Sequence, residues 1–258
     1  MNRNTKKIVM NVLPVLSIVL LILFWIWVSM DEKSLIPSPT EVIQRFIILL
    51  QHPISKTSIE KHIWASLSRV LSALVYASVI GISFGLLISW SKTFRALLKP
   101  LFEMMRPVPP IAWIPLITIW FGIDELSKII IVFIGAVMPI VVNTYTGVTL
   151  VPELNLDAGR IFGANNRQLL LDIVLPSSIP AIVAGVKTAL GTGWMVVLAA
   201  EMISAKTGLG FLIIRGSDSD DIALTMVSMI FIGLVGALLS TLLTLLERWL
   251  CPWRTDIN

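Results

Sequence analysis

The chain has 258 residues, of which 56% are hydrophobic and 14% are charged. Soluble domains carry about 25% charged residues, so this composition excludes an ordinary water-soluble domain and predicts an all-α protein embedded in membrane lipid. The formal net charge of +4 is spread along the chain without a run of like charges, which favours a role in membrane orientation over nucleic-acid binding. Cys251 is the single cysteine and the two histidines match no ligand spacing, so we expect no metal site.

Six apolar segments are long enough to cross a bilayer, whose hydrocarbon core needs about 20 apolar residues per helix. They are Ile8–Met30, Trp64–Trp90, Leu101–Gly122, Leu126–Leu150, Ser177–Ile203 and Ile222–Leu250. The first could also be a secretory signal peptide. Its apolar run is too long for a signal peptide and has no small-x-small cleavage site, so the sequence favours an uncleaved first span.

The distribution of basic residues predicts the orientation, because Lys and Arg are enriched in short cytoplasmic loops. With the N-terminus inside, the cytoplasmic segments hold Arg3, Lys6, Lys7, Lys92, Arg95, Lys99, Arg160, Arg167, Arg248 and Arg254. The outer loops hold acidic residues: Asp31, Glu32, Asp124, Glu125, Asp218, Asp220 and Asp221. Three basic residues in the outer 37–61 segment weaken this bias: Arg45, Lys56 and Lys61. We therefore expect a multi-pass membrane protein with both termini in the cytoplasm.

The outer 31–63 segment contains one further predicted helix. Thr40–Leu50 has the pattern of a short amphipathic helix that follows a Pro37-Ser38-Pro39 break and lies at the membrane interface. The chain is thus predicted to consist of an N-terminal part, residues 1–63, and a transmembrane domain, residues 64–254.

Small residues predict where the spans touch, because close packing drives helix association in lipid. Two stripes at four-residue steps are expected to be helix contacts: Ala73, Ala77, Gly81 and Gly85 in the second span, and Gly185, Ala189 and Gly193 in the fifth.

The third span has a different character, because it contains Pro107, Pro109, Pro110 and Pro115. Each proline removes a backbone donor and clashes with the preceding turn, so we expect this helix to be broken or kinked. Irregular backbone is tolerated in a membrane against protein or a water-filled cavity. A wall of a solute pathway and a kinked packing helix both fit this pattern.

Charged residues near the spans are candidates for such a pathway, because a charge at mid-bilayer costs about 3 kcal/mol and usually faces the bundle interior. Glu103 and Arg106 are three residues apart and could instead pair on one helix face. Lys187, well inside the fifth span, could snorkel, pair with a carboxylate or face an anionic solute. The possible pathway residues are Arg106, Trp113, Pro115, Lys187 and Glu201.

The loop Pro152–Pro176 is long and polar for a connection between two spans. It has the pattern of a short helix, a glycine break and a second amphipathic helix that ends at Leu175-Pro176. Small residues there would let another surface approach, while an apolar pair flanked by arginines could enter a pocket and contact its rim. A protein-docking element and a re-entrant or interfacial helix explain this pattern equally well.

A resemblance to a known family separates these alternatives. The spacing Asp157-Ala158-Gly159-x3-Gly163-x9-Ile173-x-Leu175-Pro176 resembles the EAA motif of ABC importer permeases, E-A-A-x3-G-x9-I-x-L-P. In that family the motif forms a coupling helix seated in a groove of the ATPase subunit. The chain departs from the motif at Asp157, which replaces Glu, and at Gly159, which replaces Ala. The resemblance assigns ATPase coupling to Asp157, Ala158, Gly159, Arg160, Ile161, Phe162, Gly163, Arg167, Leu175 and Pro176.

Further motifs, in the same order, are similar to the branch of this family that imports sulfonates, taurine and nitrate. They are Pro100-Leu101, Arg106-Pro107, Ile111-Ala112-Trp113-Ile114-Pro115-Leu116, Trp120-Phe121-Gly122-Ile123, Ser127-Lys128, Asn143-Thr144, Leu175-Pro176, Ile179-Pro180, Ala200-Glu201-Met202 and Gly208-Leu209-Gly210-Phe211. Lys187 lies where that branch usually has Arg. Lysine lacks the bidentate fork of arginine, so this position is a weak guide to an anion preference.

The resemblance implies a type I ABC importer permease of the bacterial cytoplasmic (inner) membrane, with about six transmembrane helices. It implies a homodimer, two cytoplasmic ABC ATPase subunits and an extracytoplasmic solute-binding protein. ATP and Mg would bind to the ATPase, since this chain has no G-x4-G-K-[ST] loop. The chain itself would be no enzyme. The solute would be a small organic or inorganic anion such as a sulfonate, taurine or nitrate.

Two functions of other classes would leave different features in the sequence. An ion-gradient-driven transporter or channel would have intramembrane carboxylate pairs and inverted repeats, whereas Glu201 is isolated in the sequence and no repeat occurs. An integral membrane enzyme would use Glu103 or Glu201 as an acid or base, but neither has a His, Cys or second carboxylate at a useful spacing.

Overall fold

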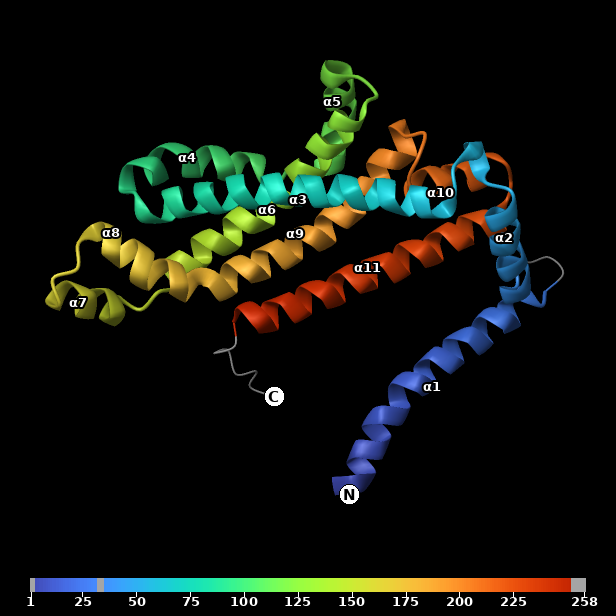
Figure 1. Ribbon diagram of the computed structural model, residues 1–258, viewed down its shortest axis with the longest axis horizontal. Helices are drawn as coiled ribbons and strands as arrows, with labels where there is room; N and C mark the ends of the chain where they lie inside the picture. The colour runs from blue at the N-terminus through green and yellow to red at the C-terminus, as the bar shows by residue number, and fades with distance from the viewer. Residues whose placement is uncertain (1–2, 32–34, 252–258) are drawn as a thin grey trace. The chain divides into compact units, whose positions relative to one another are not determined.

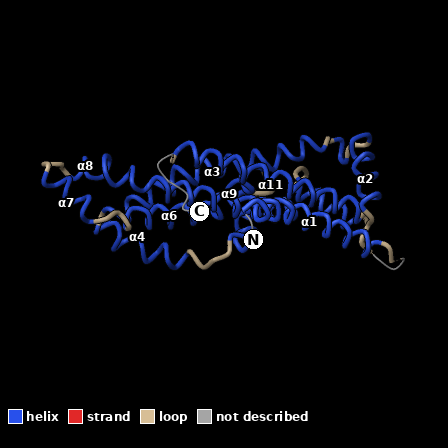
Figure 2. Tube along the Cα trace, turned by 90° about the horizontal axis from the view of Figure 1, so that it is seen from below, coloured by secondary structure: helices blue, strands red, loops and turns tan. Residues whose placement is uncertain are grey.

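The computed structural model describes residues 3–31 and 35–251, and helices make up most of this part of the chain, with short loops between them (Figures 1 and 2). No strand occurs within the described residues, in agreement with the predicted all-α class. The chain divides into two compact units: residues up to Ile59 with Leu212–Ile230, and Glu60–Phe211 with the residues from Phe231 onward. Helices α10 (Leu209–Asp218) and α11 (Ile222–Leu250) contribute to both units. The predicted domains, 1–63 and 64–254, stay a prediction.

The first unit contains α1 (Arg3–Ser29) and α2 (Pro39–Gln51). A capping box starts α2: the Ser38 hydroxyl accepts the backbone N–H of Glu41 at 3.3 Å, and the Glu41 carboxylate accepts the N–H of Ser38 at 2.7 Å. Proline is favourable in the first turn of a helix, where its missing N–H would have had no partner. The predicted helix at Thr40–Leu50 is confirmed, and its position at a membrane interface stays a prediction.

Two further features complete this unit. A short 3-10 turn, η1 (Ile54–Lys56), follows α2. The Arg45 guanidinium on α2 pairs with the Asp221 carboxylate at 2.6 Å, just before α11 begins. This pair ties the outer segment to a residue that lies 176 positions later in the chain.

The second unit is built around α3 (Ile59–Trp90), α6 (Glu125–Thr149) and α9 (Leu175–Ser204). Helix α6 packs along α9 (Figure 1). The two predicted stripes of small residues lie at these contacts. A side-chain carbon at Gly81 would come within 3.0 Å of Ile140, and one at Gly185 would come within 2.7 Å of the Asn143 Cβ. Glycines on α3 and on α9 therefore allow each of these two helices to pack closely against α6.

The third predicted span is broken, as its prolines predict. Helix α4 (Lys92–Met105) ends before Arg106-Pro107, and a 3-10 turn, η2 (Pro110–Trp113), leads into α5 (Ile114–Phe121). Figure 1 shows α5 turned away from the direction of α4. Because Pro107, Pro109 and Pro110 supply no N–H, the intrahelical hydrogen bonds cannot continue through this segment.

Four helices in the described part of the chain are long and apolar enough to cross a membrane: Ile59–Trp90, Glu125–Thr149, Asn166–Ser204 and Ile222–Trp249. The other two predicted spans correspond to the shorter apolar helices Val15–Ser29 and Pro110–Phe121. Each of the six predicted spans therefore corresponds to an apolar helix. Among the described residues, four of these helices are long enough to cross a membrane.

The loop between α6 and α9 begins as predicted and ends differently. It contains α7 (Glu153–Ile161), a turn at Gly163 and the single-turn α8 (Asn166–Gln168). The predicted end of the second helix at Leu175-Pro176 is wrong. A π-helical segment, Leu169–Val174, joins α8 directly to α9. Its wider i→i+5 hydrogen bonding changes the register just before Pro176, so the missing N–H of that proline does not end the helix.

Candidate functional site

Three large apolar side chains are exposed around the short helix α7. Leu154 is 78% exposed, Ile161 is 83% exposed and Phe162 is 90% exposed. The helix also carries polar and charged residues, and its other large apolar side chain, Leu156, is partly buried. Large apolar side chains gathered on a polar element outside the apolar spans are typical of a protein-binding surface. We refer to Leu154, Ile161 and Phe162 as the α7 patch.

Helix α7 packs against the rest of its unit through Leu156, although the α7 patch is exposed. Leu156 packs against a buried cluster of Val148, Val151 and Val174, which lie at the end of α6 and just before α9. Leu86 and Trp90, near the end of α3, pack against the same cluster. Through this contact, α7 is linked to three of the long helices of its unit.

Two glycines allow this arrangement. A side-chain carbon at Gly159 would come 2.6 Å from Ile173 and 2.7 Å from Leu169, so the small residue lets α7 lie against the π-helical segment. Gly163 has φ of +83°, a conformation that glycine adopts without strain. Asn165 then caps α8 by accepting the N–H of Gln168 at 2.9 Å. Gly159, which departs from the motif, therefore has a packing role.

The charged residues predicted to act in this loop are exposed. The Arg160 guanidinium pairs with the Asp157 carboxylate one turn earlier on α7, at 2.8 Å. Arg167 is exposed at the start of α8. Of the remaining residues assigned to coupling, Ala158 and Pro176 are exposed and Leu175 is partly exposed. Most of the predicted residues thus lie on accessible surface of the loop.

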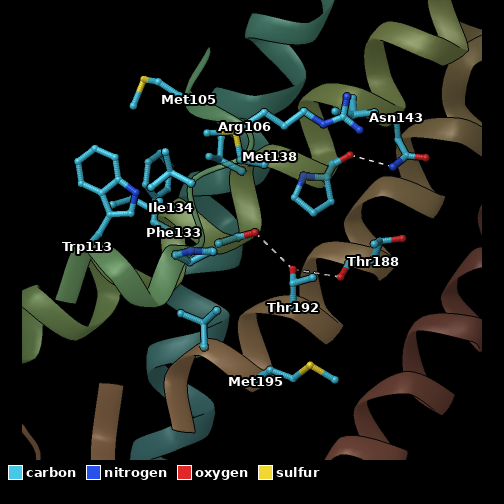
Figure 3. Close-up of a pocket in the computed structure, with 17 residues that line it drawn as sticks. Met105, Arg106, Trp113, Phe133, Ile134, Met138, Asn143, Thr188, Thr192 and Met195 are labelled. Atoms are coloured by element: carbon cyan, nitrogen blue, oxygen red, sulfur yellow. Dashed lines mark hydrogen bonds between the residues drawn. The ribbon is translucent and has the colours of Figure 1, made fainter. Parts of the chain in front are cut away.

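A cavity of about 640 Å³ lies in the second unit between η2, α6 and α9, next to the end of α4 (Figure 3). Its lining is mostly apolar and includes Met105, Val108, Trp113, Phe133, Ile134, Met138, Met195 and Val196. The polar residues that line it are Arg106, Asn143, Thr188 and Thr192. Pockets of about 300–1,000 Å³ hold drug-sized ligands, so this cavity is large enough for a small organic molecule.

Two of the five possible pathway residues line this cavity: Arg106 and Trp113. Pro115 lies in the first turn of α5 and is not one of the lining residues. The Lys187 ammonium lies 3.3 Å from the Glu247 carboxylate of α11, so the structure supports the carboxylate-pair alternative for this lysine. Glu103 and Arg106 approach to 3.7 Å, as their spacing predicts.

Glu201 is not isolated in the structure, in contrast to the interpretation of the sequence. Its carboxylate is fully buried and lies 2.5 Å from the Arg69 guanidinium of α3. It also accepts the Ser66 hydroxyl at 2.8 Å and the backbone N–H of Gly210 at 3.0 Å. Glu201 therefore has a structural partner for its charge and lies outside the cavity.

Arg69 is the residue that sequence reasoning missed. Its guanidinium uses all five N–H groups: two bond the Glu125 carboxylate, one bonds Glu201, and two bond the carbonyl and hydroxyl of Thr207. The Lys128 ammonium adds a contact with Glu125 at 2.9 Å. A charged residue within an apolar span was the available signal, the same one that drew attention to Lys187. We call Arg69, Glu125, Lys128 and Glu201 the buried charge cluster, since three of them are nearly inaccessible.

Comparison with known proteins identifies the family. Residues 77–256 match the family of binding-protein-dependent transport system inner membrane components. The chain belongs to this family. The permease is 32% identical to the taurine transport system permease protein of Escherichia coli, over 93% of this chain and 88% of that protein. It is also 32% identical to the nitrate import permease protein of Synechocystis sp., over 93% of this chain and 89% of that protein.

Other relatives agree with this assignment. A protein of Methanocaldococcus jannaschii assigned as an ABC transporter permease is 36% identical, over 97% of this permease and 94% of its own length. The solved structure of the MetNI methionine ABC transporter in an inward-facing conformation has a chain that superposes with a TM-score of 0.62 at 19% identity. The alignment covers 72% of this permease and 93% of that chain, and it confirms the predicted type I importer fold.

Proposed function

We propose that this permease is the membrane subunit of an ABC importer, that it moves a small anion across the cytoplasmic membrane, and that a separate subunit hydrolyses ATP. The observation that carries the proposal is the exposed α7 patch on a helix that packs against the ends of the long helices. Permeases of this family work with ATPase and solute-binding partners. The patch supplies a surface on which an ATPase could act.

The assembly would contain two copies of the permease, two cytoplasmic ABC ATPase subunits and one extracytoplasmic solute-binding protein. ATP and Mg would be bound by the ATPase subunits, and this chain would bind no cofactor and carry out no catalysis. Both termini would lie in the cytoplasm, on the same side as α7. The basic residue Arg254, which contributes to that orientation, lies outside the described residues.

The contacts of α7 suggest how a movement would be transmitted. When the ATPase subunits close on ATP, they would move the two copies of α7 toward each other. Leu156 and the cluster of Val148, Val151 and Val174 would carry that movement to α6 and α9. These two helices supply most of the cavity lining, so displacing them changes access to the cavity. Hydrolysis would then reverse the movement.

The lining of the cavity supports an anion as the solute. Arg106 is the only charged residue among the described residues that line it. Relatives of the permease are named for the transport of taurine, nitrate and bicarbonate. A sulfonate, taurine or nitrate is therefore a fitting solute class for the proposed importer.

Substitution of Phe162 tests the coupling role. Phe162→Asp places a charge where an apolar side chain would enter the ATPase. Loss of an aromatic anchor at the centre of an interface typically costs at least about 2 kcal/mol, which is roughly a 30-fold loss of affinity. We expect the variant to lose co-purification of the ATPase subunit and ATP-dependent uptake into proteoliposomes.

The matched control is Asn166→Asp, which adds the same charge to the same loop and removes no apolar side chain. It lies at the first position of α8, where a carboxylate is favourable, and it should retain ATPase binding. If Phe162→Asp keeps both ATPase association and uptake, α7 is not the coupling element.

A further inference from the structure

The buried charge cluster and α7 lie at opposite ends of the same three helices. Arg69 lies in the first half of α3, Glu125 begins α6, and Glu201 lies near the end of α9. The other ends of these helices meet at the three buried valines against which Leu156 of α7 packs (Figure 1). Since α6 has 25 residues and rises about 1.5 Å per residue, these two contact regions are roughly 35 Å apart along it.

Between these two regions, the helices pack mainly through small and apolar residues. A side-chain carbon built at Gly193 of α9 lies 3.4 Å from Val132 of α6 and 3.9 Å from Val70 of α3. The Thr192 hydroxyl reaches the Gly135 carbonyl of α6 at 3.3 Å, but it lies nearer to a carbonyl of its own helix. Van der Waals contacts are individually weak and have no preferred direction, so this packing restrains sliding of one helix along another only weakly.

The cluster adds contacts that do have a direction. The Arg69 guanidinium donates to both oxygens of Glu125, at 2.6 and 2.7 Å, and to Glu201 at 2.5 Å. It also donates to the Thr207 carbonyl at 2.8 Å. The N–H groups form a rigid planar fork, so a shift of one helix by a single residue rise, about 1.5 Å, would break the set. Replacing a buried ion pair by apolar residues is often neutral for stability, and the best-attested use of buried polar groups is to fix register.

The cluster divides into two halves that are each neutral. Arg69 and Glu201 form one half, and the other half is the pair of Glu125 and Lys128 on α6, whose charged groups lie 2.9 Å apart. Either half can therefore be removed without leaving a buried charge uncompensated. Such a removal separates loss of register from loss of charge balance.

We propose that the buried charge cluster fixes the register of α3, α6 and α9, so that a movement imposed on α7 reaches the opposite ends of all three helices. Arg69 is then a positioning residue for transport, since it lies outside the cavity lining and far from the α7 patch. This role rests on the proposed function, because the movement of α7 is the one that an ATPase would impose. Without the cluster, the helices move at the α7 end and slip at the other end.

Distances between spin labels test this role in the permease co-purified with its ATPase subunit in lipid nanodiscs. In the Cys251→Ala background, Asn166→Cys places a label at the start of α8 and Lys206→Cys places one in the turn after α9; both native side chains are exposed. Double electron–electron resonance measures the distance between equivalent labels on the two copies, without nucleotide and after trapping with ATP and vanadate. With the native cluster, we expect trapping to change both distances.

The first variant, Arg69→Met with Glu201→Met, removes the half of the cluster that joins α3 to α9. We expect the distance at Asn166 to change as it does with the native cluster, because α7 and its contacts are intact. The change at Lys206 should fall by at least half, because the end of α9 no longer follows the other helices.

The second variant, Glu125→Gln with Lys128→Gln, removes the other half and leaves the pair Arg69–Glu201 in place. The Glu125 side chain is 61% exposed, so this variant tests the role even if the first one fails to fold. Asp124 is exposed beside the start of α6, and a label at Asp124→Cys should lose at least half of its distance change.

The control is Arg45→Met with Asp221→Asn, which removes an ion pair of 2.6 Å in the other compact unit. The amide of asparagine keeps an acceptor at the start of α11, where the Asp221 carboxylate accepts the N–H of Leu224. Both distance changes should be the same as with the native residues.

An undiminished change at Lys206 in the first variant, or at Asp124 in the second, overturns the proposal. Equal losses at Asn166 and Lys206 also overturn it, because they show a general loosening of the fold. Failure of the proposed function gives a different result. If trapping changes neither distance with the native cluster, the ATPase does not move α7, whereas a change at Asn166 alone keeps the coupling role and removes the relay.

Discussion

At the scale of single residues, the buried charge cluster brings together charged side chains from α3, α6 and α9. The side chains of Arg69 and Glu201 are 2% and 0% exposed, and they lie 132 positions apart in the chain. Burying two charges is costly, and it is compensated when hydrogen bonds satisfy both groups. Here the guanidinium uses all of its N–H groups, and the carboxylate accepts Ser66 and Gly210 as well as Arg69.

The same contacts fix a turn of the backbone. Gly208 has φ of +124° and donates its N–H to the Nδ1 of His62 at 3.0 Å, while the Ser66 hydroxyl accepts the N–H of Leu209 at 2.9 Å. A side chain at Gly208 would collide with the Glu201 carboxylate. The pair Arg69–Glu201 therefore joins α3 to the end of α9 and to the turn that follows it.

Removing one partner should be far more damaging than removing both. Arg69→Met leaves Glu201 buried without its countercharge, which typically costs about 3–5 kcal/mol. We expect a clear fall in the apparent unfolding temperature. Intrinsic tryptophan fluorescence of the permease in nanodiscs measures this temperature. The double variant Arg69→Met, Glu201→Met removes both charges and should recover part of that loss.

The exposed pair Asp157–Arg160 is the control for this experiment. Both side chains are 59% exposed, and exposed pairs contribute about 0–1 kcal/mol, so Asp157→Asn should change the unfolding temperature little. A double variant no more stable than Arg69→Met alone would show that the cluster stabilises the fold in some way other than mutual compensation of charge.

Helices and their local breaks could be predicted from the sequence, and the partners of charged side chains could not. Apolar length, the Ser38 cap and the prolines after α4 act within a few residues, so their effects can be read locally. The sequence places Arg69 in an apolar span. It does not show that the carboxylates of Glu125 and Glu201 contact the Arg69 guanidinium, because these contacts depend on how α3, α6 and α9 pack. The same limit applies to the cavity: Asn143, Thr188 and Thr192 share no local pattern that marks them as its lining.

At the scale of elements, the turn between α7 and α8 positions the α7 patch. The error at Leu175-Pro176 has a physical reason, since a proline usually ends or kinks a helix and the π-helical segment before it is not visible in an apolar periodicity. Because that segment makes α8 continuous with α9, the chain changes direction between α7 and α9 at the turn that contains Gly163.

Substitutions at Gly163 test the turn with no interference from packing. No atom lies within 4 Å of a side-chain carbon built there, so an alanine changes only the backbone preference. The left-handed conformation costs an ordinary residue roughly 1–2 kcal/mol, and asparagine less. We expect Gly163→Ala to weaken binding of the ATPase subunit by up to about 30-fold, and Gly163→Asn to weaken it less. Affinity measured on the permease in nanodiscs checks the order; equal effects of the two variants would show that φ at Gly163 does not limit binding.

At the scale of the whole molecule, the predicted orientation requires an odd number of crossings between the outer segment and the loop that carries α7. The predicted second, third and fourth spans lie between them. The third is the one whose helix is broken, into α4 and the short α5. If α4 and α5 together cross once, Lys56 and Asn166 lie on opposite sides of the membrane. If that segment enters and returns to the same side, they lie on the same side.

Single cysteines distinguish the two arrangements. Cys251 is the only cysteine of the chain and is buried, so Cys251→Ala gives a background without thiols. Lys56→Cys and Asn166→Cys then each introduce one exposed thiol. A membrane-impermeant maleimide should label Lys56→Cys in intact cells and Asn166→Cys only after permeabilisation. The reverse pattern would invert the orientation derived from the basic loops, whereas labelling of both in intact cells would show that α4 and α5 do not form one crossing. In that case α7 could not face a cytoplasmic ATPase, so this measurement bears on the coupling role independently of Phe162.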